Sequence, residues 1–181
     1  MYLILLTRIG NPKKGSFYMT TERTEDYLKV IEKVIERKGY AQVKDVSREL
    51  ELSSPSVTGM FKKLTKMGYI NYEKYGGVTL TPEGEKIAKC TMEKHSVIRD
   101  FLLILGLSEE IADHDACKIE HVLTTETFET LTKFVEFMNM REEWPYWLDH
   151  FNHYCETGEY INCTPAAKDT CPVHGKKNTQ V

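Results

Sequence analysis

The sequence predicts a mainly α-helical protein that begins with a winged helix-turn-helix. Apolar residues recur at helical spacing along much of the chain, whereas β-branched and aromatic residues form only two short strand-like runs, 69–72 and 78–80. A glycine pair between these runs permits a tight turn, so together they predict a β-hairpin. Three predicted helices precede it, which is the element order of a winged helix-turn-helix. The first helix is expected to start with Thr24 as its N-cap.

Length and composition are those of a globular protein. With 181 residues, 41% of them hydrophobic, the chain can bury a core in one large domain or two small ones. The only early apolar run, residues 2–6, is too short to span a bilayer and follows no basic stretch, so we expect a cytoplasmic protein without a membrane partner. Five cysteines cannot all pair as disulfides, and thiols in a reducing compartment often bind metals.

Charge divides the chain into two halves of opposite sign. Residues 20–81 hold eleven Lys or Arg against nine Asp or Glu, a net charge of +2, whereas residues 82–145 hold seven against fourteen, a net charge of −7. Only the N-terminal half is therefore suited to a polyanion. We expect four regions. Residues 1–18 are a disordered extension or a mis-assigned start, and residues 19–81 form the winged helix-turn-helix. Residues 82–143 form an all-helical domain, and residues 144–181 an aromatic, cysteine-containing tail.

The third predicted helix has the side chains of a DNA-reading helix. A hydroxyl residue that can cap the helix is followed by a proline where the missing N–H is harmless. The face opposite its apolar stripe carries hydroxyls and lysines, which can reach phosphates and base edges. A solvated helix face has a similar composition, but helix order, cap and wing together favour double-stranded DNA as the partner. The candidate DNA-binding residues are Ser53, Ser54, Pro55, Ser56, Thr58, Lys62 and Lys63.

A cluster of possible metal ligands lies in the acidic half. Ser108 can cap a helix that is predicted to extend to about Leu123. In this helix Cys117, Glu120 and His121 occupy positions i, i+3 and i+4, so a thiolate, a carboxylate and an imidazole project from one face. A partly buried charge is costly unless it is paired or bound to a cation, which favours a transition-metal site. The residues alone leave open a solvated surface helix with Cys117 in the core.

These features together resemble the DtxR/MntR family of metal-dependent transcriptional repressors. The resemblance implies a homodimer with an all-helical dimerisation and metal-binding domain, which represses metal-uptake genes when Fe(II) or Mn(II) stabilises its DNA-binding conformation. It extends from Met19 to about Glu143. It rests on Thr24-Glu25-Asp26-Tyr27-Leu28, Ser53-Ser54-Pro55-Ser56-Val57-Thr58, Tyr72-Glu73-Lys74-Tyr75-Gly76-Gly77, Leu80-Thr81-Pro82-Glu83-Gly84, His95 and Cys117-x-x-Glu120-His121.

The resemblance also implies the metal ligands. Asp26 corresponds to an aspartate of the manganese-type members, and Cys117 to a cysteine of the iron-type members. His95, Glu120 and His121 correspond to ligands that both branches share. This hybrid set suits several divalent transition metals, and we rank iron slightly ahead of manganese.

Two positions depart from the family pattern. Lys29 stands where the manganese branch has a glutamate that bridges two ions, and Arg99 stands where members often have a glutamate near the histidine. An ammonium group three residues after Asp26 adds positive charge where a second ion would need a carboxylate. We therefore expect one well-defined ion per subunit, with residues 113–115 as weaker ancillary ligands at most.

The C-terminal tail contains a second possible metal motif. Its cysteines and histidine follow the pattern C-x7-C-x7-C-x2-H, of which only the last step has usual zinc-ligand spacing. A structural zinc ion and a flexible tail with reduced thiols both remain open. The residues concerned are Cys155, Cys163, Cys171 and His174.

Two other functions compete with metal sensing. A winged-helix regulator could respond to a small ligand or to thiol oxidation at Cys117 rather than to a metal. A hydrolase could use Cys117 and His121, but both lie on one predicted helix and no oxyanion-binding loop is identifiable. The sequence therefore predicts a regulator and no enzyme.

Overall fold

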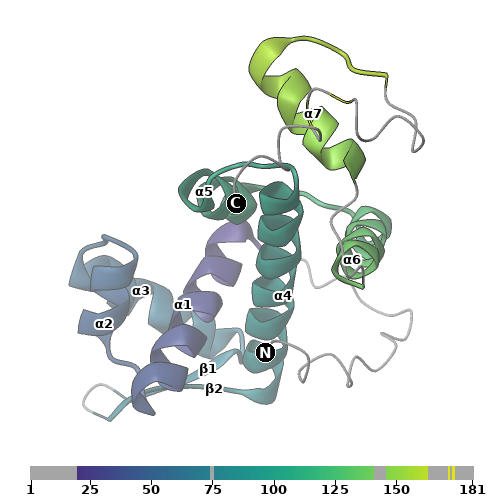
Figure 1. Ribbon diagram of the computed structural model, residues 1–181. Coiled ribbons are helices and arrows are strands. Elements are labelled where there is room, and N and C mark those ends of the chain that lie inside the picture. Colours follow the sequence, from purple (N-terminus) through teal and green to yellow (C-terminus); the bar gives the residue numbers. More distant parts are fainter. Residues whose placement is uncertain (1–19, 74–75, 141–145, 163–170, 172, 174–181) are drawn as a thin grey trace.

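The computed structural model describes residues 20–73, 76–140, 146–162, 171 and 173, and its described part confirms a mainly helical fold (Figure 1). The whole expected N-terminal extension, residues 1–18, lies outside the described part of the chain. In chain order the elements are α1 (Glu22–Lys38), α2 (Val43–Glu49), α3 (Ser54–Lys66), β1 (Ile70–Glu73), β2 (Gly77–Leu80), α4 (Pro82–Ile104), α5 (Glu109–Ile119), α6 (Thr125–Asn139) and α7 (Tyr146–Thr157).

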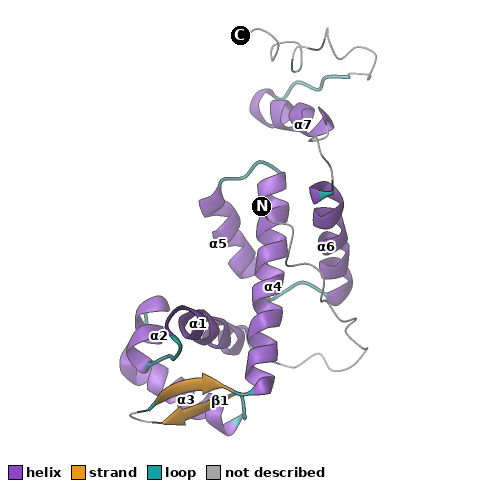
Figure 2. Cartoon of the chain, turned by 60° about the horizontal axis from the view of Figure 1, so that its bottom comes forward, coloured by secondary structure: helices purple, strands orange, loops and turns teal. Residues whose placement is uncertain are grey.

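The N-terminal lobe is a winged helix-turn-helix (Figure 2). The strands β1 and β2 pair antiparallel, with Ile70 opposite Leu80, and Ala41 adds an isolated bridge to Val78. The apolar stripe of α3 faces the core of this lobe, as its spacing predicts. Its buried members are Val57, Met60, Phe61 and Leu64.

Helix α1 begins earlier than the sequence indicated. Its N-cap is Thr21, in extended conformation, and the backbone N–H of Thr24 donates to the Thr21 carbonyl oxygen at 2.7 Å. Both threonines suit an N-cap, but Thr24 is buried, and its hydroxyl pairs with that of Thr21 at 3.0 Å. The earlier start places Glu22 in the first turn, one turn before Asp26 and on the same face.

Helix α4 connects the winged helix-turn-helix to the helices that follow it, α5 and α6. Thr81 caps it by accepting a hydrogen bond from Gly84 N at 3.2 Å, and Pro82 occupies the first turn, where proline is tolerated. A Cβ atom on Gly84 would lie 2.0 Å from the carbonyl oxygen of Tyr69, so only glycine permits this approach of α4 to the wing. From there α4 packs against α1, α5 and α6, and so sets the position of α5 above α1 (Figure 1).

Helix α5 ends at Ile119, before the predicted end near Leu123. Glu120 is its C-cap, and its N–H donates to the Ala116 carbonyl oxygen at 3.0 Å. His121 follows in a turn that leads to α6, which Thr124 caps. The turn redirects the chain after Glu120, so His121 no longer shares a continuous helical face with the earlier residues of α5.

A second, smaller core lies between α4, α6 and α7. It consists of Ile104, Val135, Met138 and Leu148 and is extended by an edge-to-face contact of Phe101 with Phe134 at 5.7 Å. Among the described helices, none combines the length and the apolar character needed to cross a bilayer.

Candidate metal centre

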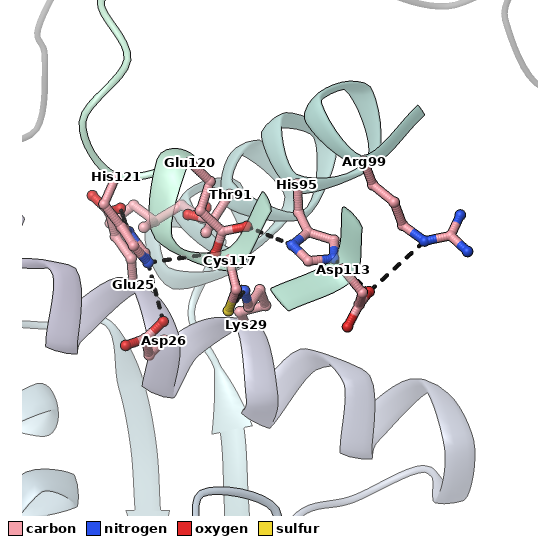
Figure 3. Close-up of polar contacts among 11 residues, drawn as sticks. Glu25, Asp26, Lys29, Thr91, His95, Arg99, Asp113, Cys117, Glu120 and His121 are labelled. Atoms are coloured by element: carbon pink, nitrogen blue, oxygen red, sulfur yellow. Dashed lines mark hydrogen bonds and ion pairs between the residues drawn. The ribbon is translucent and has the colours of Figure 1, made fainter. Parts of the chain in front are cut away.

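The five predicted ligands lie close together where α1, α4 and the end of α5 meet (Figure 3). They do not converge on a single point. Their donor atoms fall into two neighbouring groups, within each of which all atoms lie within 4.8 Å of one another. We call His95, Cys117 and Glu120 the inner group, and Glu22, Asp26 and His121 the outer group.

The inner group is built around the carboxylate of Glu120, which is 0% exposed. Glu120 accepts a hydrogen bond from Lys29 Nζ and lies 2.8 Å from His95 Nδ1. Burial by itself would raise the pKa of Glu120, but the hydrogen bonds from His95 and Lys29 outweigh it and hold the pKa below its ordinary value. The carboxylate is therefore charged and paired.

Lys29 supplies a buried positive charge to the same group. Its Nζ donates to Glu120 and lies 3.4 Å from Cys117 Sγ. Burial opposes the charged amine, yet the hydrogen bond to Glu120 and the charges of Glu120 and Cys117 raise the pKa of Lys29 above its ordinary value. The ammonium thus contacts two of the predicted ligands directly.

Both ring nitrogens of His95 have acidic neighbours. Nδ1 faces Glu120, and Nε2 lies 3.0 Å from Asp113 Oδ1. The hydrogen bond to Glu120 is the largest influence on the pKa of His95, which is raised despite burial. Arg99, the second departure from the family pattern, lies 3.8 Å from the same Asp113 oxygen. Asp113 therefore holds the orientation of the His95 ring through its contact with Nε2.

The outer group contains a buried nitrogen without a hydrogen-bond partner. The His121 side chain is 4% exposed, and its Nδ1 lies 2.8 Å from Glu25 Oε2. Its Nε2 lies 3.2 Å from Asp26 Oδ1 and 3.4 Å from Glu120 Oε1, but among the described residues it has no partner with hydrogen-bond geometry. Burial raises the pKa of Asp26, against the lowering effects of His121 and Lys29.

This arrangement fits a metal cation. In a neutral imidazole, a carboxylate on Nδ1 fixes the proton there and leaves the Nε2 lone pair free. Nε2 of His121 lies among carboxylate oxygens of Asp26 and Glu120, where a cation bound by these groups would interact favourably with them (Figure 3). The carboxylate of Glu25 has the position and chemistry of an outer partner that orients a ligating histidine.

Sequence reasoning missed two carboxylates of this site. Glu22 was overlooked because the predicted helix began at Thr24, which left Glu22 outside the first turn. The role of Glu25 cannot be predicted from spacing, because its contact with His121 joins residues that are far apart in the chain. The spacing of Glu22 and Asp26, one helical turn apart, was the available signal for Glu22.

The predicted DNA-binding residues lie along the start and outer face of α3. Ser53, Ser54, Pro55, Lys62 and Lys63 are exposed, whereas the other two predicted residues are half-buried. The Ser53 hydroxyl accepts a hydrogen bond from the backbone N–H at position 56, so it caps the helix.

The half-buried residues of this face have neighbours of their own. Thr58 donates a hydrogen bond back to the Ser54 carbonyl oxygen at 2.9 Å. The hydroxyl of Ser56 lies 3.5 Å from the guanidinium of Arg23, which brings a further cation from α1 to this face.

The structure describes only part of the predicted tail motif. Cys163 and His174 lie outside the described residues, and Cys155 is exposed. Cys171 is buried, and its Sγ lies 3.3 Å from Nε2 of His150 on α7, a histidine that the sequence motif did not include. Among the described residues, no group of three close ligand atoms contains either described cysteine of the tail.

Two family models match most of the chain. One is described as "Iron dependent repressor, N-terminal DNA binding domain" and matches residues 19–78. The other, "Iron dependent repressor, metal binding and dimerisation domain", matches residues 81–143.

Known relatives carry the name "HTH-type transcriptional regulator MntR". The chain is 41% identical over 125 residues to the protein of Bacillus pumilus, a match that covers 69% of this chain and 87% of that protein. It is 40% identical over 119 residues to the protein of Listeria welshimeri, covering 66% and 84% of the two chains.

Solved structures with the same fold include metal regulators. The manganese regulator SloR matches with a TM-score of 0.57 at 30% identity, and the IdeR protein of T. acidophilum with a TM-score of 0.56 at 31% identity. The matches cover 65% and 66% of this chain. The chain spans about half the length of these two proteins, 55% of each.

Proposed function

This chain belongs to the family of iron-dependent repressors, and from that membership we propose that Fe(II) or Mn(II) controls its DNA binding from the junction of α1, α4 and α5. The family is one of metal-responsive, DNA-binding transcriptional repressors rather than enzymes. Membership therefore favours a metal effector over a small ligand or thiol oxidation. The candidate ligands at the junction are Asp26, His95, Cys117, Glu120 and His121.

The observation that carries this proposal is the buried Nε2 of His121, which lies between two carboxylates but has no partner with hydrogen-bond geometry among the described residues. It faces Asp26 across the boundary between the matched DNA-binding and dimerisation domains. An ion bound to both residues would tie α1 to the end of α5, and so fix the DNA-binding head relative to the dimerisation domain. A coupling free energy of about 1–3 kcal/mol between the two sites would change DNA affinity by roughly 5- to 150-fold.

We propose α3 as the helix that enters the major groove of a double-stranded operator. A homodimer would present two copies of α3 to half-sites separated by about one helical turn or a multiple of it. We place this activity in the cytoplasm. The regulated genes would be metal-uptake genes, which are repressed when the bound ion reports a sufficient metal supply. The proposed DNA contacts are Ser53, Ser54, Pro55, Ser56, Thr58, Lys62 and Lys63.

The role of α3 predicts a change in salt dependence. Replacing Lys62 and Lys63 by alanine should weaken DNA binding about tenfold or more at moderate salt and flatten its salt dependence by about one unit of slope per lost phosphate contact. Both side chains are exposed, so folding should not change. Fluorescence anisotropy with labelled DNA at several salt concentrations, under saturating Mn(II), measures both quantities.

The exposed lysines Lys118 and Lys133, on α5 and α6, provide the matched control. Their double alanine variant loses the same charge outside the winged helix and should bind DNA nearly as the wild type does. The Lys62/Lys63 variant should also retain its Mn(II) affinity. Unchanged DNA affinity and salt slope in that variant would remove α3 from the DNA interface.

A further inference from the structure

We infer that the ion binds in the outer group, with Glu22 as a ligand beside Asp26 and His121, while Lys29 acts as the cation of the inner group and keeps Cys117 from the metal. This inference rests on the proposed metal-dependent function and specifies where the ion lies. It departs from the single five-residue site that the sequence predicts.

The inner group already contains its positive charge. Lys29 Nζ contacts both Glu120 and Cys117, and its side chain is only 6% exposed. A metal ion bound to the same two ligands would have to displace a buried ammonium or lie beside it, and two like charges at contact distance repel strongly in a partly buried setting. The free energy that a metal would gain by neutralising Glu120 is therefore already provided by Lys29.

The outer group has the opposite charge balance. Its carboxylates come from Glu22 and Asp26, and the neighbouring Glu25 adds a third negative charge behind His121. The nearby cation of the same turn, Arg23, is directed to Ser56 on α3. The outer group therefore combines negative charge with a buried nitrogen that has no hydrogen-bond partner among the described residues.

Glu22 is placed to complete this site. It lies one turn before Asp26 on the same face of α1, so both carboxylates can approach one ion without distortion of the helix. Its oxygen lies within 4.8 Å of the donor atoms of Asp26 and His121. Glu22 is exposed and the Asp26 side chain is 33% exposed, which leaves the site open to solvent on this side for an entering ion.

The ligand chemistry then changes the expected metal preference. Two carboxylates and one imidazole, completed by water, form an oxygen-rich set without sulfur. Such a set suits Mn(II) or Fe(II) better than metals that prefer thiolate ligands. With Cys117 held by Lys29, the main reason for ranking iron ahead of manganese is removed.

The cobalt spectrum of the wild-type protein tests whether Cys117 is a ligand. Co(II) bound to a thiolate gives an intense charge-transfer absorption in the near ultraviolet, whereas Co(II) bound to carboxylates and imidazole does not. We expect one Co(II) per chain without this absorption. An intense thiolate band in the loaded wild type would overturn the inference, and this measurement needs no variant that must fold.

Mn(II) titration of three variants tests the role of Glu22. We expect Glu22→Gln to weaken Mn(II) binding about tenfold or more. Loss of a residue that only orients a ligand typically lowers metal affinity by about this factor, and loss of a ligand itself should lower it at least as much. The control Glu36→Gln removes an exposed carboxylate from the last turns of the same helix and should change the affinity less than about twofold. Cys117→Ala should change it less than about threefold.

The outcomes separate this inference from the proposed function. If Glu22→Gln binds Mn(II) as the wild type does, or if Cys117→Ala loses at least as much affinity as Glu22→Gln, the outer site is wrong while metal control of DNA binding stands. If the wild type binds neither Mn(II) nor Co(II), the proposed function itself fails.

Discussion

Replacement of His121 by alanine is expected to abolish the metal-stimulated part of DNA binding and to weaken Mn(II) binding by about 100-fold. The variant loses the buried Nε2 that faces Asp26, and with it the proposed bond between the dimerisation domain and α1. DNA binding of the chelated protein should stay the same. Isothermal titration calorimetry gives the Mn(II) affinity, and DNA titrations with and without Mn(II) give the coupling.

The control for His121 is His114, an exposed histidine on α5 whose ring lies beside Asp115 rather than in the metal centre. His114→Ala should retain Mn(II) affinity and metal-stimulated DNA binding. Size-exclusion chromatography of both variants checks that the oligomeric state is preserved. Normal Mn(II) stimulation in His121→Ala would exclude this imidazole as the link between the domains.

Replacement of Lys29 by alanine is expected to lower the free energy of unfolding of the metal-free protein by about 3 kcal/mol. The variant removes the ammonium partner of the fully buried Glu120 carboxylate and leaves His95 as its remaining close partner, and loss of one partner of a buried charge is costly. Urea denaturation of chelated protein measures the loss. Lys33→Ala, one turn further along α1 and exposed, is the matched control and should change stability by less than about 0.5 kcal/mol.

Metal should partly restore the Lys29→Ala protein. Without the ammonium, the inner group can accept a cation, so Mn(II) should raise the stability of this variant more than that of the wild type. Saturation at 100 times the dissociation constant would contribute about 2.7 kcal/mol per site. A variant that loses no stability when chelated would contradict the role of Lys29 as the cation of the inner group.

Local patterns were sufficient to predict the recognition helix and the wing. The spacing of Val57, Met60, Phe61 and Leu64 matches the buried face of α3, because an amphipathic helix on a core leaves a regular trace in the sequence. The helix ends were less predictable. Thr21 and Thr24 have the same capping chemistry, and only the tertiary burial of the second selects the first as the N-cap.

The division of the metal centre could not be predicted from spacing. The resemblance to a family identified the ligand types, and the position of Lys29 already indicated a single ion. That Lys29 reaches Cys117 and Glu120 depends on how α1 packs near α5, a contact between residues about ninety positions apart. The turn after Glu120, which directs His121 toward α1 instead of along α5, is likewise set by packing at the junction.

Metal control of DNA binding is tested by titrating the wild-type protein against fragments of its source genome, first with a chelator and then with Mn(II) or, without oxygen, Fe(II). Mobility shifts should be weak with the chelator and become specific for a few fragments when either metal is added, with an affinity gain of roughly 5- to 150-fold. Equal binding of the same fragments with the chelator and with every metal would contradict the proposed control.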